Sequence, residues 1–86
     1  MIIKKKIWPE YFNAVLSGKK KFELRLADFE VEEGDIIILE EWNPKTKKYT
    51  GRKIDKKVSF VLKFKLDDFS QEEQIKEKGL VVIQME

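Results

Sequence analysis

The sequence predicts a single small α+β domain: a mixed, mostly antiparallel barrel of about five to six short strands with two short helices. Three observations predict this fold class. The chain has 86 residues, which is enough for one core but not for two. Short apolar or alternating segments are separated by turn residues along most of the chain. Most of the connections are too short for a crossover helix, which favours antiparallel neighbours.

A strand, a helix and a second strand are predicted in the first third of the chain. Residues 1–7 form a short apolar strand that contains a run of lysines. Pro9 suits the first position of a helix, and Gly18 suits its end. The helix carries apolar residues at helical spacing, namely Tyr11, Phe12, Val15 and Leu16. Residues 22–26 alternate strictly between apolar and charged side chains, which predicts a strand with one face in the core.

Three further strands are predicted in the middle of the chain. Gly34 and Asp35 have turn chemistry, and the unbroken apolar run 36–39 after them predicts a buried strand. Residues 42–46 close this strand, so that residues 48–54 can return as its hairpin partner. Residues 58–64 alternate between apolar and more polar side chains, which predicts another half-buried strand.

A second helix and a last strand complete the prediction. Ser70 and Glu73 are spaced as a capping box, and Gly79 suits the end of the helix that they begin. Residues 80–85 form a last apolar strand. The predicted order is therefore β-α-β-β-β-β-α-β without βαβ units, and six short strands around one core favour a small barrel. Residues 1–86 are interpreted as one domain.

Charged residues make up 40% of the chain, yet they nearly cancel to a net charge of +2. They are segregated into blocks, because residues 1–25 carry +5, 26–43 carry −7, 44–65 carry +8 and 66–86 carry −4. Two basic blocks on one face would make a stripe suited to nucleic acid. The alternative is that folding interleaves the blocks into an ion-paired, solvated surface. The strong preference for lysine over arginine resembles the surfaces of thermophile proteins.

Two absent residue types limit the chemistry that the chain can perform. Without cysteine there is no thiol nucleophile or disulfide, and without histidine the usual general base and metal ligand are missing. The carboxylates of residues 30–41 lack the loop spacing of a hard-cation site, so we expect no metal and no other cofactor. No apolar run is long enough for a membrane span or a signal sequence, and we expect a monomeric, cytoplasmic protein.

One motif brings together residues with chemical potential. Residues 18–25 contain the pattern G-x-K-x-x-E-x-R, whose charged members are Lys20, Glu23 and Arg25. Glu23 and Arg25 share one face of a predicted strand, and Lys20 lies at the turn that leads into it. Such a cluster could bind a base edge or a phosphate. The competing interpretation is an exposed strand face tied by ion pairs of roughly 0–1 kcal/mol.

In its context this motif resembles that of a known family. The order of segments over essentially the whole chain resembles the ASCH domain superfamily of PUA-like folds, above all its small stand-alone members described as RNA-binding. The segments are Trp8-Pro9-Glu10-Tyr11-Phe12, the motif itself, Gly34-Asp35, Glu41-Trp42, Tyr49-Thr50-Gly51-Arg52 and Leu80-Val81-Val82-Ile83. The resemblance implies a PUA-like pseudobarrel with a cleft beside its first helix. It also implies that Lys20, Glu23 and Arg25 line this cleft, which would receive RNA or a nucleotide.

The chain also departs from the family pattern. Leu26-Ala27-Asp28 replaces a turn rich in Asn, Asp and Arg, and no histidine stands near the start. Some ASCH proteins resemble acetylcytidine amidohydrolases, which use a lysine, a threonine three residues later and a distant glutamate. Lys20 matches the lysine, but Glu23 stands where the threonine should be, and a carboxylate cannot replace a hydroxyl without a change of mechanism. An amidohydrolase with Lys20 as base and Glu23 as acid is therefore the minority hypothesis.

Aromatic and basic side chains around the predicted hairpin extend the candidate site. Trp42 and Tyr49 could stack on bases or belong to the core, whereas Trp8 is expected in the core. The cations of this region could follow a phosphate backbone or protect an edge strand from aggregation. They are Lys45, Lys47, Lys48, Arg52, Lys53, Lys56 and Lys57.

The leading hypothesis is a non-catalytic module that binds RNA or a modified nucleotide. Lys20 and Arg25 would contact phosphate or base acceptors, and Glu23 would accept a hydrogen bond from a base amino group. The remaining expected contacts are Lys19, Lys21, Trp42, Tyr49 and Arg52. Two alternatives remain open, namely the amidohydrolase acting on an acylated nucleoside and a protein-interaction module whose lysine-rich hairpin docks an acidic partner.

Overall fold

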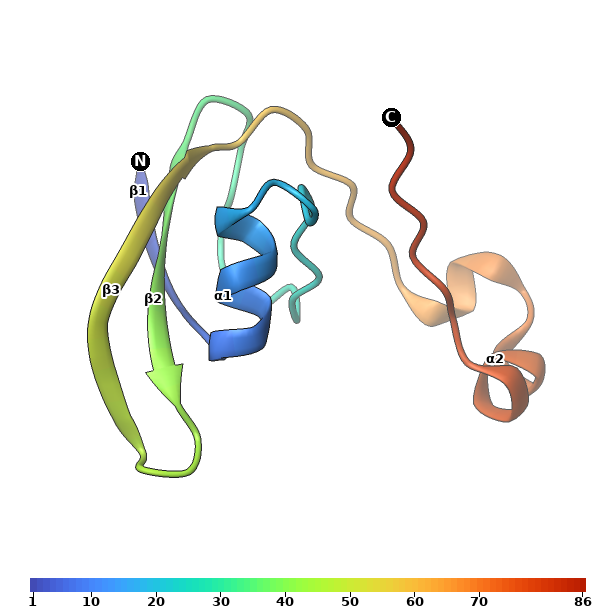
Figure 1. Ribbon diagram of the computed structural model, residues 1–86. Coiled ribbons are helices and arrows are strands. Elements are labelled where there is room, and N and C mark those ends of the chain that lie inside the picture. Colours follow the sequence, from blue (N-terminus) through green and yellow to red (C-terminus); the bar gives the residue numbers. More distant parts are fainter.

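The computed structural model describes residues 1–86 and contains one three-stranded sheet, two α-helices and a short 3₁₀ helix. Figure 1 shows α1 lying against the sheet, whereas α2 lies well to one side of it. In chain order the elements are β1 (Ile2–Ile7), α1 (Pro9–Leu16), β2 (Ile36–Asn43), β3 (Lys48–Lys57), η1 (Leu66–Phe69) and α2 (Glu72–Lys78).

The strands lie in the order β1-β2-β3. β1 runs parallel to β2, with Ile2 opposite Ile36, and β3 runs antiparallel to β2, with Lys57 opposite the same Ile36. Because α1 lies between two adjacent parallel strands in the sequence, β1, α1 and β2 form a crossover unit. The expectation of a sheet without βαβ units is therefore wrong, whereas the hairpin of β2 and β3 is confirmed.

The core lies between α1 and one face of the sheet. Ile7, Phe12, Val15 and Leu39 form a buried cluster, and Ile37 and Ile54 pack against it. The helix begins at Pro9 and ends at Leu16, as its sequence signals predict. Only part of its apolar stripe is buried, because Tyr11 and Leu16 remain about half exposed. Trp8, which was expected in the core, is 47% exposed, so that expectation is wrong.

A register irregularity in the hairpin decides which side chains of β3 face α1. Glu40 pairs with Lys53 and Trp42 pairs with Tyr49, so one residue of β2 lies opposite three of β3. The middle one of these three is Gly51, with a φ of +93° that side chains rarely adopt. Thr50 and Arg52 on either side of it consequently both point toward Glu41.

Replacing Gly51 by alanine should lower the free energy of unfolding by about 1–2 kcal/mol, which is the cost of a left-handed backbone for a residue with a Cβ. No atom lies within 4 Å of the position that the new Cβ would take, so backbone strain alone carries the effect. Urea denaturation of the two proteins measures it. An alanine variant as stable as the parent would contradict the assigned geometry.

The predicted barrel is wrong, because the sheet has three strands and remains open. Residues 22–26, 58–64 and 80–85 form no strand, although their apolar alternation or runs predicted three. Figure 1 shows residues 58–64 leading from the end of β3 toward η1, and residues 80–85 running from α2 toward the C-terminus. Alternation makes one face of a segment apolar, but a strand also needs a neighbour's backbone along its length. Only Val58 in these three segments has such a partner, because its amide and carbonyl bond to the backbone of Asp35 and Gly34.

The second helix is confirmed, but its predicted cap is wrong. α2 begins at Glu72 after Gln71 and ends before Gly79, as expected from the glycine. Ser70 does not cap it, because this residue instead ends η1 in a left-handed conformation with φ of 54°. None of the helices has the length and apolar character needed to cross a membrane.

Candidate functional site

The charged members of the motif, Lys20, Glu23 and Arg25, form one cluster, which we call the triad. Lys20 Nζ donates to Glu23 Oε1 at 2.6 Å, and Arg25 Nε donates to Glu23 Oε2 at 2.8 Å. The side chains are partly shielded from solvent, with exposed fractions of 18%, 19% and 30% in sequence order. The predicted proximity of the three residues is therefore confirmed, although the segment that carries them is not a strand.

The turn after α1 places Lys20 beside aromatic rings. Gly18, with φ of +81°, releases the chain from the helix, and the amide of Lys20 still donates to the Ala14 carbonyl. The Lys20 ammonium then lies 5.1 Å from the centre of the Phe22 ring and 5.8 Å from that of Tyr11. These ring faces attract a cation and hold it in the cluster.

Arg25 attaches the triad to the free edge of β1. Its Nη2 donates to the backbone carbonyl of Lys6 at 2.8 Å. Lys6 in turn places its ammonium 4.2 Å from the centre of the Trp42 ring. The triad is therefore joined to the sheet through Lys6, a residue that no sequence motif indicated.

Lys19 and Lys21, on either side of Lys20 in the sequence, are exposed. The backbone around them is held by Gln84, whose Oε1 accepts from the Lys21 amide at 2.5 Å and whose Nε2 donates to the Lys19 carbonyl at 3.2 Å. This contact joins residues more than sixty positions apart, and nothing in the sequence near Gln84 indicates it.

A second cluster lies on the α1 side of the sheet, around the carboxylate of Glu41. This residue is only 3% exposed, and it accepts hydrogen bonds from Thr50 Oγ1 at 2.5 Å and from Arg52 at 2.9 and 2.6 Å. Arg52 also donates to Asn13 Oδ1 at 3.0 Å and lies 4.6 Å from the centre of the Phe12 ring. The cluster thus ties α1, β2 and β3 together.

The environment of Glu41 keeps it ionised. The hydrogen bonds from Arg52 and Thr50 lower the pKa of Glu41 from 4.5 to about 2, although its burial acts in the opposite direction. The same carboxylate raises the pKa of Arg52. Arg52, predicted to contact nucleic acid, therefore binds an internal carboxylate, and its half-exposed side chain lies on the face opposite Tyr49.

Trp42 and Tyr49 lie opposite each other in the register of β2 and β3, on the face of the sheet that α1 does not cover. Trp42 is half-buried and Tyr49 is 57% exposed. The structure therefore brings these two predicted residues together, whereas Arg52 lies on the other face of the sheet. Lys6 joins them to the triad.

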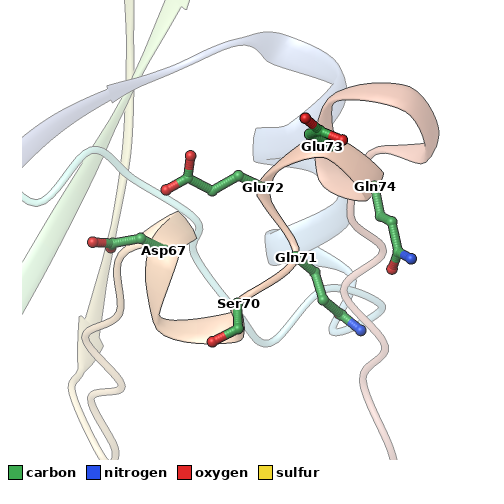
Figure 2. Close-up of a pocket in the computed structure, with 6 residues that line it drawn as sticks. All are labelled: Asp67, Ser70, Gln71, Glu72, Glu73 and Gln74. Carbon is green, nitrogen blue, oxygen red and sulfur yellow. The ribbon is translucent and has the colours of Figure 1, made fainter.

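A separate hollow of about 440 Å³ lies between η1 and α2, and its lining contains three carboxylates. Figure 2 shows its side chains spreading outward rather than converging on one point. They belong to Asp67, Ser70, Gln71, Glu72, Glu73 and Gln74, with no apolar residue among them. This lining is unlike that of a ligand pocket, and no group of three or more acidic residues in the structure is arranged to hold a metal ion.

Comparison with known proteins places the chain in a family. Residues 2–78 match the family described as a domain of unknown function (DUF3850). The chain belongs to this family. The matched residues include the triad and the Glu41 cluster but not Gln84.

A relative in Escherichia phage P2, described as an uncharacterized 12.9 kDa protein in the GpA 3' region, is 41% identical over 56 residues. These residues cover 65% of this chain and 50% of the relative, so the chain spans about half of that curated protein. Neither description names an activity or links the family to the ASCH superfamily, and that resemblance stays a prediction.

Proposed function

We propose that the domain binds RNA or a modified nucleotide without turnover, and that the triad is its anion-binding centre. The observation that carries this proposal is the arrangement of two cations around one carboxylate. Glu23 orients Lys20 and Arg25 through its two oxygens, and the resulting cluster keeps one positive charge. Partial shielding from solvent strengthens the attraction of that charge for a phosphate.

Both cations retain donors for a ligand. A lysine ammonium has three N–H donors, of which Lys20 uses one for Glu23. An arginine has five, and Arg25 uses Nε for Glu23 and one Nη2 hydrogen for the Lys6 carbonyl. The remaining donors suit phosphate oxygens, and the exposed Lys19 and Lys21 add positive charge nearby.

The main role that we propose for Glu23 is to position the two cations. Each of its oxygens already accepts a hydrogen bond from one of them, although a carboxylate has about four acceptor positions in all. A base amino group can therefore only be an additional donor to the oxygens of Glu23. This makes the phosphate contacts of Lys20 and Arg25 the main source of affinity.

Direct titration tests the proposal. Fluorescence anisotropy of a labelled single-stranded RNA should report binding at low salt. The logarithm of the association constant should fall with the logarithm of salt concentration, and the two phosphate contacts of the triad should contribute about −1.4 to the slope. Absence of binding at low ionic strength would overturn the proposal. Nuclease-insensitive recovery of a protein partner would favour the interaction module in its place.

Replacing Glu23 by glutamine separates phosphate binding from base recognition. The change removes the charge that offsets Lys20 and Arg25, so we expect binding of uridine and cytidine oligomers to tighten about equally, by roughly threefold to tenfold. Anisotropy titrations with the two oligomers measure this. A selective loss of cytidine binding would instead assign Glu23 to the base amino group.

The amidohydrolase alternative gains no support from the contacts of the triad. No hydroxyl side chain forms a hydrogen bond with Lys20 or Glu23, and the lysine is held by the carboxylate as an ion pair. A lysine in this state is a poor general base. Incubation with acetylcytidine at high protein concentration should accordingly release no cytidine, and its release would restore the enzyme hypothesis.

A further inference from the structure

The face of the sheet opposite α1 is open. Ile7 and Leu39 point into the core, so the residues before and after them on each strand point away from it. Figure 1 shows no segment of the chain covering this side. The residues of this open face are Ile2, Lys4 and Lys6 on β1, Ile36, Ile38, Glu40 and Trp42 on β2, and Tyr49, Lys53, Asp55 and Lys57 on β3.

Positive charge without internal partners surrounds this face. None of its four lysines (Lys4, Lys6, Lys53 and Lys57) forms a salt bridge, and all four are exposed. Two carboxylates also belong to the face, because Glu40 lies between Lys6 and Lys53 and Asp55 lies opposite Ile38, so its net charge is +2. Lys45 and Lys47, in the turn between β2 and β3, are also exposed and extend the positive charge beyond the end of the sheet. A polyanion therefore complements the open face.

Two aromatic rings lie among these lysines on the open face. Trp42 and Tyr49 are direct neighbours across β2 and β3, where opposite side chains are about 5 Å apart. The ammonium of Lys6 already lies over the Trp42 ring. Rings on an open sheet, surrounded by lysines, suit stacked bases whose phosphates reach the lysines.

We propose that a single-stranded RNA segment of several nucleotides continues from the triad across the open face, with bases on Trp42 and Tyr49 and phosphates at Lys6 and Lys53. Lys6 makes the two regions continuous, because its carbonyl accepts from Arg25 and its side chain contacts Trp42. The inference rests on the proposed function of the triad, and it names the ligand as a polynucleotide and not a mononucleotide.

Fluorescence of Trp42 tests the inference directly. A Trp8→Phe variant leaves Trp42 as the one tryptophan, and Trp8 is exposed enough for this change to be tolerated. An oligouridylate of ten nucleotides should quench its emission, whereas uridine monophosphate should not. Quenching by the monophosphate alone, or by neither probe while the oligomer binds, would overturn the inference.

A matched pair of charge reversals gives a second readout. Lys53 and Lys56 are both exposed on β3, but Lys53 belongs to the open face and Lys56 lies opposite Ile37 on the α1 side. Lys53→Glu should weaken binding of the oligomer about tenfold, and Lys56→Glu should weaken it much less. Tyr49→Ala should also cost about tenfold, through lost stacking. Equal effects of the two reversals would count against the open face.

The two proposals fail differently. If RNA binds and depends on Lys20 and Arg25 but is insensitive to Lys53→Glu and Tyr49→Ala, only the open-face inference is overturned. If the parent protein binds no RNA at low salt, the proposed function fails and the inference fails with it. Circular dichroism spectra of each variant, compared with the parent, identify any variant that has lost its fold.

Discussion

Replacing Glu41 by glutamine should lower the free energy of unfolding by about 3 kcal/mol, which is a large part of the stability of a domain of this size. The carboxylate is buried and accepts three hydrogen bonds, two of them from the Arg52 guanidinium. A glutamine has one oxygen for these donors and turns its own amide hydrogens toward the others. Because the cluster joins α1, β2 and β3, its loss weakens the whole core region.

Glu40→Gln is the matched control for this change. Glu40 is the neighbouring residue on β2, points to the opposite face and forms no salt bridge. Its replacement should alter stability by less than about 0.5 kcal/mol. Chemical denaturation of the parent and both variants measures the difference, and similar losses in the two variants would contradict the assigned network.

The same carboxylate predicts how stability depends on pH. The pKa of Glu41 is about 2 in the folded protein and 4.5 in its ordinary state, so the unfolded chain takes up the proton first as the pH falls. The contribution of Glu41 is therefore fully present above about pH 4.5 and is lost progressively toward pH 2. Thermal melts across this window should show the parent losing stability faster than Glu41→Gln. Parallel curves would contradict the lowered pKa.

Reversing both cations of the triad should abolish most RNA binding. Lys20→Glu with Arg25→Glu changes the charge of the cluster from +1 to −3 and removes both proposed phosphate contacts. We expect the dissociation constant at low salt to rise at least about a hundredfold, and the salt slope to become shallower by about 1.4. The lost ion pairs are partly exposed, so the fold should persist.

The control for this double variant is an equal change of charge elsewhere. Lys63 and Lys78 are exposed, form no salt bridge and lie outside both the triad and the sheet. Lys63→Glu with Lys78→Glu should therefore reduce affinity only severalfold, through net charge alone. Comparable losses in the two double variants would mean that the total charge, and not the triad, governs binding.

Local signals in the sequence predicted the elements that depend on local chemistry. Pro9 and Gly18 bracket α1, and the turn residues between β2 and β3 give their hairpin. The parallel pairing of β1 with β2 could not be predicted in this way, because the choice of a neighbouring strand depends on contacts across the whole fold. The same reason explains why three alternating or apolar segments were wrongly assigned as strands.

The candidate sites also differ in whether local spacing or long-range contacts form them. The spacing of Lys20, Glu23 and Arg25 within six residues was enough to predict their proximity. The Glu41 cluster depends on the register irregularity at Gly51. The link that Lys6 makes between the triad and the sheet depends on a contact with Arg25, nineteen residues away. Neither arrangement produces a local pattern in the sequence, so Glu41 could not be distinguished from the other acidic residues of 26–43.

The most direct measurement for the central proposal is the NMR signal of the Arg25 Nε–H group during titration with a short single-stranded RNA. This group donates to Glu23 at the centre of the triad, so it reports on ligand contact there. We predict a dose-dependent shift of this signal together with the amides of residues 19–21, and no shift around the acidic hollow at residues 67–74. Shifts confined to the hollow, or an unchanged Arg25 signal while the RNA is bound, would contradict the proposal.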